Sequence, residues 1–169
     1  MSLNSSDLKN LNQSSPFIEL YTLDGSGFGG STYRFTNYGL SGTTVSFGGV
    51  AYTVFPVTAS GFDYLSGQNP QPKLTVANVL RTLITEIINF GDLVGYKVIR
   101  RRTFAKHLDG AANADSTKYL EDVFYIEQKT AQNSSSIEFL LSSAYDLGGR
   151  KFGRVIRAND FPGIKLSKG

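Results

Sequence analysis

Hydrophobic residues in this sequence alternate with polar ones over segments of strand length, and a period of two favours β-structure. The first such segment is FIELYTL at residues 17–23, and glycine-rich turns separate it from those that follow. Residues 45–47 and 50–55 flank Gly48-Gly49, a typical two-residue hairpin turn. Other strands are predicted at 33–38, 73–77, 93–108, 123–131, 136–142 and 152–158.

One segment has the period of a helix instead. In residues 79–90, VLRTLITEIINF, the apolar positions recur at spacings of three and four, and Gly91 follows as a stop signal. Residues 59–72, with two prolines, are expected to be a loop. The sequence therefore predicts an α+β, β-rich fold of antiparallel sheets with one long helix at about 79–90.

Composition agrees with a β-rich globular protein and excludes some kinds of site. The 169 residues include 12 Phe, 9 Tyr and 18 Gly, which suit pleated surfaces and turns. There is no cysteine, so disulfides, thiolate metal sites and cysteine nucleophiles are excluded. The polar N-terminus shows no signal peptide, and no apolar run is long enough to span a membrane. We therefore expect a protein that begins as a soluble cytoplasmic product.

The sharpest local feature is the basic run VIRRRTFAKHL at residues 98–108. In a strand, Arg100 and Arg102 share one face and Arg101 takes the other, so the three form no flat phosphate track unless a β-bulge intervenes. We interpret Arg100, Arg101, Arg102 and Lys106 as candidates for ion pairs or a subunit interface, where arginine is enriched. Glu127 or Glu138, on later strands, is the favoured partner. The acidic candidates considered are Glu86, Asp92, Asp109, Glu121, Asp122, Glu127 and Glu138.

The same run leaves a second hypothesis open, a nucleic-acid-binding β-domain. In that reading Arg100–Arg102, Lys97 and Lys106 contact phosphates and Phe104 stacks on bases. The net charge is only +3 and the basic residues are scattered, whereas dedicated nucleic-acid domains gather them on one face. Contact with a specific nucleotide sequence is not expected.

The remaining motifs predict no catalytic, cofactor or metal site. GSGFGG at residues 25–30 precedes a strand instead of a helix, so it indicates a hairpin loop and not a phosphate loop. His107 is the single histidine, and neighbours Glu121 and Asp122 would point to opposite faces of a strand. A small hydrolase with a hidden Ser/His site is the weakest alternative, because no serine stands in a nucleophile elbow.

Several stretches, taken in order, resemble one family of phage proteins. They are ASGFDY (59–64), PKLTVAN (72–78), LVGYKVIRRRTFAKHLD (93–109), YIEQ (125–128), IEFLLSSAYD (137–146) and KFGRVIRAN (151–159). Together they resemble the minor tail protein L family of lambda-like long-tailed phages, over residues 16–159. The resemblance implies a structural, non-enzymatic hub protein with barrel-like domains, located in the virion at the tail tip. It also implies a homotrimer that links the distal tail, tail-tip and central fibre proteins and aids tail assembly and closure, without a small-molecule substrate.

The resemblance also suggests how the chain is divided, and where it departs from the family. We expect an N-terminal arm at 1–15, a tail-hub domain at 16–159 and a C-terminal tail at 160–169. A division of the hub domain into two sub-domains near 60–92 is the alternative. Family members continue into a cysteine-bearing extension that holds an iron–sulfur cluster, and this chain has no cysteine to hold one.

The missing thiolates lead to a first prediction. The purified protein should be colourless and free of iron, because clusters of this kind are held by cysteine sulfur. Absorbance spectra and elemental analysis measure both properties. A visible absorbance band together with stoichiometric iron would contradict the prediction.

Overall fold

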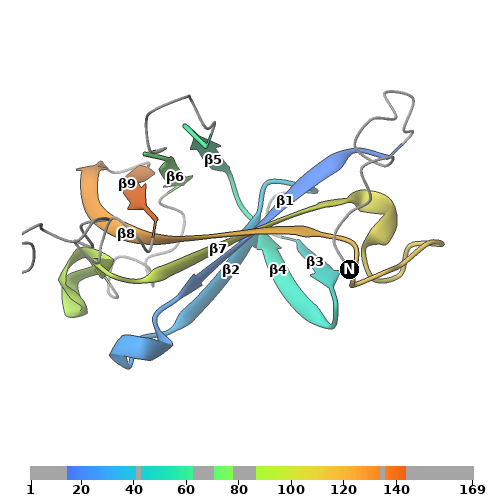
Figure 1. The fold of residues 1–169 in the computed structure, drawn as a ribbon, viewed down its shortest axis with the longest axis horizontal. Helices are drawn as coiled ribbons and strands as arrows, with labels where there is room; N and C mark the ends of the chain where they lie inside the picture. The colour runs from blue at the N-terminus through green and yellow to red at the C-terminus, as the bar shows by residue number, and fades with distance from the viewer. Residues whose placement is uncertain (1–14, 41–42, 63–70, 78–86, 134–135, 144–169) are drawn as a thin grey trace, which may run out of the picture.

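The computed structural model describes residues 15–40, 43–62, 71–77, 87–133 and 136–143, and these ranges form one sheet. The strand order is β3-β4-β2-β1-β7-β8-β9-β6-β5. Figure 1 shows the long strands crossing at the middle of the molecule. The nine strands are β1 (Phe17–Asp24), β2 (Thr32–Thr36), β3 (Thr44–Phe47), β4 (Val50–Val54), β5 (Val57–Ser60), β6 (Lys73–Ala77), β7 (Lys97–Phe104), β8 (Leu120–Gln132) and β9 (Ser136–Ser142).

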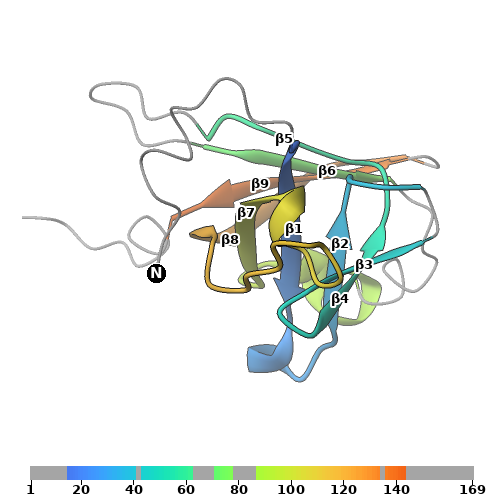
Figure 2. The same cartoon turned by 90° about the vertical axis from the view of Figure 1, so that its right-hand side faces the viewer.

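The sheet is antiparallel except where β2 meets β4. Its two outer portions lie on opposite sides of the crossing, with β3 and β4 on one side and β5, β6 and β9 on the other (Figure 1). Seen from the side, β5 and β6 run across the direction of β1 and β2 (Figure 2). The central pair β1–β7, matched residue for residue over eight positions, joins the two portions.

Each portion of the sheet has its own hydrophobic core, and β1 contributes to both. Ile18 and Leu20 face the core that contains Phe47 and Tyr52. Alternation sends Tyr21 and Leu23 to the opposite face. There they join the larger core, which also contains Phe35, Val57, Leu74, Val76, Ile87, Leu93, Tyr96, Val98, Phe124, Ile126, Ile137, Phe139 and Leu141. A central strand with both faces buried explains why the apolar alternation of its sequence is incomplete.

The expected α+β class with one long helix at 79–90 is wrong. The described residues form a mainly β fold, and their helical parts are residues 87–89 and three-residue 3₁₀ turns. Residues 79–86 lie outside the described residues. Of the apolar stripe, Ile87 is buried in the larger core, whereas Ile88 is largely exposed. Periodicity alone cannot tell a helix from other arrangements of a short apolar run, so it is a weak guide to fold class.

Two further expectations on the strands are corrected. Residues 57–60, partly assigned to a loop, form β5 against β6. The segment 93–108 is extended only over Lys97–Phe104, and 3₁₀ turns at Gly91–Leu93 and Ala105–His107 flank it. The β-bulge considered for the arginine run lies elsewhere, since β7 pairs in continuous register with β1, and the shifts occur between β8 and β9. The expected strand at 152–158 is outside the described residues.

The glycine-rich loop after β1 is a hairpin loop, as its sequence indicates. It contains the turn Ser26–Phe28 and returns the chain into β2. A side chain on Gly25 would come within 2.2 Å of the Tyr96 ring, so glycine is required for this close approach. The Phe28 ring also stacks on the Tyr96 ring, with ring centres 5.6 Å apart. The loop is thereby fastened to the segment that leads into β7.

One carboxylate attaches the β3–β4 hairpin to the end of β7. Gly48 and Gly49, both with positive φ, form the hairpin turn. Their N–H groups donate to the Asp109 carboxylate at 2.9 and 2.8 Å, and the Ser46 hydroxyl donates to it at 2.8 Å. These hydrogen bonds, with the one from Gly49 contributing most, lower the pKa of Asp109 below its ordinary value.

This anchor predicts a pH dependence at the hairpin. Because the folded-state pKa of Asp109 is depressed, its contribution is present above the ordinary pKa of about 4. It is lost as the pH falls through the lower folded value. Amide NMR shifts of Gly48 and Gly49 should therefore stay constant down to mildly acidic pH and move only below it. In Asp109→Asn this transition should disappear; its persistence would show that another group holds the turn.

Candidate functional site, a cross-strand ladder of ion pairs

The arginine run lies on β7, between β1 and β8 at the centre of the sheet. Arg100 stands opposite Tyr21 of β1 and Asp122 of β8, and Arg102 stands opposite Glu19. Because side chains alternate along a strand, these five residues share one face. The register thus brings two cations and two carboxylates together from three strands that are far apart in the sequence.

Arg100 is the most enclosed of these charges. Only 9% of the surface of Arg100 is exposed to solvent. The guanidinium donates to Glu19 through Nε, 3.1 Å from Oε1, and through a second, closer nitrogen. Another nitrogen lies 3.8 Å from Asp122 Oδ2, and the Phe62 ring centre lies 4.0 Å from the guanidinium carbon. The cost of removing this guanidinium from water is therefore offset by two carboxylates and by an aromatic ring stacked on it.

The remaining contacts extend this pair into a chain of five residues. Arg102 donates to the same Asp122 oxygen at 2.9 Å, so Asp122 bridges the two arginines. At the other end, the Tyr21 hydroxyl donates to Glu19. We call the series Tyr21–Glu19–Arg100–Asp122–Arg102 the ion-pair ladder. Burial, followed by the hydrogen bond to Glu19, raises the pKa of Tyr21 well above its ordinary value, so this phenol remains a donor.

The other two basic residues of the run lie outside the ladder. Arg101 faces the opposite side, where it pairs with Glu121 at 2.7 Å and lies 5.0 Å from the Tyr119 ring centre. The Lys106 ammonium lies 5.3 Å from the ring centre of Phe104. The structure therefore does not gather the four predicted residues into one patch. It divides Arg100 and Arg102 from Arg101 and places Lys106 beyond the end of the strand.

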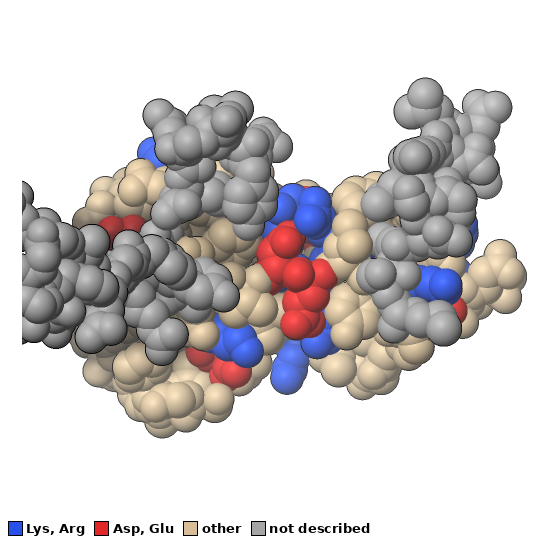
Figure 3. Space-filling view, viewed as in Figure 1, with Lys and Arg blue, Asp and Glu red and all other residues tan. Residues whose placement is uncertain are grey.

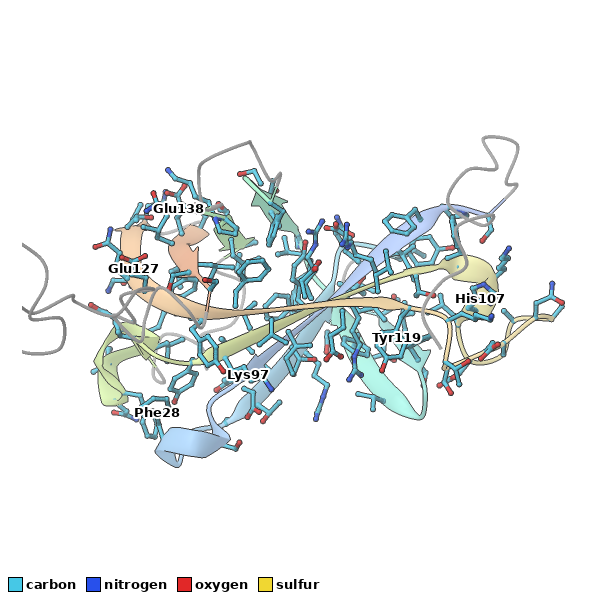
Figure 4. The ribbon with its side chains drawn as sticks, in the orientation of Figure 1. Phe28, Lys97, His107, Tyr119, Glu127 and Glu138 are labelled. Carbon is cyan, nitrogen blue, oxygen red and sulfur yellow. The ribbon has the colours of Figure 1, made fainter. Side chains whose placement is uncertain are left out.

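The two carboxylates favoured as partners do not contact the arginines, whereas Glu121 and Asp122, also among the acidic candidates, do. Glu138 pairs with Lys73 at 3.2 Å. Figure 4 shows Glu127 and Glu138 at the end of β8 and β9 farthest from His107, away from the central crossing. Sequence reasoning missed Glu19, although it is the one charged residue in the interior of β1. That placement was the available signal, because a carboxylate between buried neighbours requires a cation opposite.

Charge on the visible face is most concentrated at the middle of the molecule. Figure 3 shows acidic and basic side chains side by side there, and smaller charged groups towards both ends. The middle is where β1, β7 and β8 cross in Figure 1. Mixed charge at the crossing is suited to holding strands together and offers no uniform field to an anion.

The described residues contain neither a cluster of metal ligands nor a membrane-spanning helix. Within these, no group of three His, Asp or Glu side chains is placed to hold a metal ion. His107 is buried, and its Nδ1 lies 3.1 Å from the Asn113 carbonyl oxygen. Over the same ranges, no helix is long and apolar enough to cross a membrane.

Comparison with known proteins identifies the family. Residues 26–162 match the family described as phage minor tail protein L. The chain belongs to this family. It is also 30% identical, over 156 residues, to the tail tip protein L of Escherichia phage lambda, covering 87% of this chain and 67% of that relative. The family match includes β7 and β8, whereas β1 lies before its first residue.

Membership of the minor tail protein L family makes the chain a structural component of a phage tail, found in the virion and associated with other tail proteins. The geometry is consistent with such a part. The ion-pair ladder uses its charged groups to hold three strands of one sheet in register. This arrangement joins β1, β7 and β8 into one continuous part of the sheet.

The ladder predicts unequal effects for two adjacent arginines. Arg100→Ala should lower the free energy of unfolding by about 2–3 kcal/mol, because it leaves Glu19 half-buried without its cation. Arg101→Ala, the matched control on the opposite face, should cost less than about 1 kcal/mol, because its pair is roughly one-third exposed. Urea denaturation measures both. Equal losses would show that the ladder has no special role.

Proposed function

We propose that this chain is a hub protein of the phage tail tip. In this role it acts as a homotrimer, joins the distal tail tube to the central fibre protein, and aids assembly and closure of the tail. Assembly takes place in the host cytoplasm before the protein enters the virion. The observation that carries the proposal is the likeness to the tail tip protein L of phage lambda over 87% of this chain.

The structure supports a mechanical role over a chemical one. β1 and β7 contribute to both portions of the sheet, so force applied to one portion passes through the β1–β7 pair. The ladder clamps this pair to β8 by contacts between charged groups, which are stronger than neutral hydrogen bonds. We therefore propose the ladder as the internal support of the hub, and we propose no catalytic role for the chain.

The alternative, nucleic-acid binding by Arg100–Arg102, loses its main argument. All three guanidiniums already contact carboxylates of the same chain, and they point to two faces. A phosphate would have to displace Glu19, Asp122 or Glu121 to reach them. Binding through this strand would thus replace a carboxylate by a phosphate at each arginine, with little gain in free energy.

The proposal predicts where the protein lies in the virion. Phage particles whose own copy of this gene is deleted, and which are complemented with a tagged copy, should show antibody label at the distal end of the tail by electron microscopy. Native mass spectrometry of the purified protein or of a tail-tip subcomplex should show three copies. Label along the tail shaft, or on the capsid, would refute the proposed position.

Variants separate the mechanical role from the nucleic-acid alternative. Arg100→Ala should reduce the yield of complete tails, and Arg101→Ala should leave that yield near the wild-type level. Weak binding to duplex DNA should be the same for both variants and for the wild type in gel shifts at two salt concentrations. Loss of salt-sensitive DNA binding with normal tail yield would favour the alternative.

A further inference from the structure

The parallel pair β2–β4 is only partly closed. Each strand has five residues, yet their pairing is confined to Phe35 with Thr53 and Thr36 with Val54. Towards their N-terminal ends the two strands diverge, as Figure 1 shows. The sheet thus has a wedge-shaped opening between these two neighbouring strands.

Backbone groups of both strands point into this opening. The Thr36 carbonyl accepts from Phe55 N–H at 2.9 Å, so the even-numbered residues of β2 direct their N–H and C=O groups towards β4. Thr32 therefore presents its groups to the opening. In β4, Val54 N–H donates to Thr43 on the β3 side, so Ala51 presents its groups towards β2. Beyond the paired residues, these groups have no strand partner among the described parts of the chain.

The opening is also a cleft with a defined chemical character. It has a volume of about 390 Å³. Its lining residues are Thr32, Tyr33, Arg34, Phe35, Ala51, Thr53 and Phe55. Aromatic side chains provide an apolar floor, and Arg34 is its one cation. Arg34 is exposed, and it forms no ion pair within the described residues. This separates it from Arg100, Arg101 and Arg102, which all have carboxylate partners.

We propose that this cleft binds a short extended segment of a partner protein, with an acidic side chain that pairs with Arg34. The segment pairs with the open edge of β2 beside Thr32. Its backbone completes the open ladder, its apolar side chains meet Phe35 and Phe55, and its carboxylate meets the unpaired guanidinium. The inference rests on the proposed function only for the identity of the partner, which would be a neighbouring tail-tip protein.

Charge and hydrogen bonding together favour this occupant. An exposed strand edge attracts another strand because every unpaired N–H and C=O gains a partner. The Arg34 side chain, next to that edge, favours a segment that carries negative charge. A small apolar ligand would leave both the backbone groups and the guanidinium without partners.

The test uses the full-length protein, labelled with ¹⁵N, and two blocked octapeptides of alternating Thr and Val. One has a central Glu and the other a central Lys. The Glu peptide should shift the amide signals of residues 32–35 and 51–55. The Lys peptide should bind about tenfold more weakly, because it meets Arg34 with like charge.

Charge reversal provides the matched control. Arg34→Glu should weaken binding of the Glu peptide about tenfold and restore binding of the Lys peptide. Lys97→Glu reverses a cation two strands away from β2 and should change neither affinity. Shifts centred elsewhere, or equal binding of both peptides, would overturn the proposal. Concentration-dependent broadening of the same amides without peptide would replace the partner segment by a second copy of this chain. None of these outcomes alters the position of the protein in the virion, which electron microscopy tests separately.

Discussion

The contact between Arg100 and Glu19 is the interaction on which the rest of the structure depends. It joins β1 to β7, and these two strands hold both portions of the sheet together. A slip of one residue in this pairing would place the two charges on opposite faces and would also exchange the two cores along β1. The ion pair and the hydrophobic alternation therefore specify the same register, and both disfavour the same one-residue slip.

A buried charge pair adds little net stability compared with hydrophobic residues of the same size, because desolvation offsets the attraction. Its contribution here is better described as specificity. Arg100 has two carboxylates and the Phe62 ring around it, so a misplaced strand would leave an unpaired guanidinium in a partly dry site. The ladder thus favours a single strand register over its alternatives.

Contacts distant in sequence organise the surroundings of this centre as well. Asp109 fastens the β3–β4 hairpin, which precedes it by about sixty residues, to the end of β7. Glu138 and Lys73 join β9 to β6 in the other portion of the sheet. Between β2 and β4 the backbone ladder covers only two residue pairs and stops before the strands end. That local incompleteness is why the cleft, and not the arginine strand, is the proposed contact surface.

The sequence by itself determined the β-rich character, most strand positions, the hairpin turn at Gly48-Gly49 and the division of the arginines between two faces. These follow from local rules, namely a period of two, glycine at positive φ and the alternation of side chains. Only the tertiary structure decided that Glu19 and Asp122 are the partners of Arg100, that β5 joins the sheet, and that a long helix does not characterise the described fold. The reason is physical: strand order and register arise from pairing between distant segments, and a single strand's pattern does not specify its neighbours.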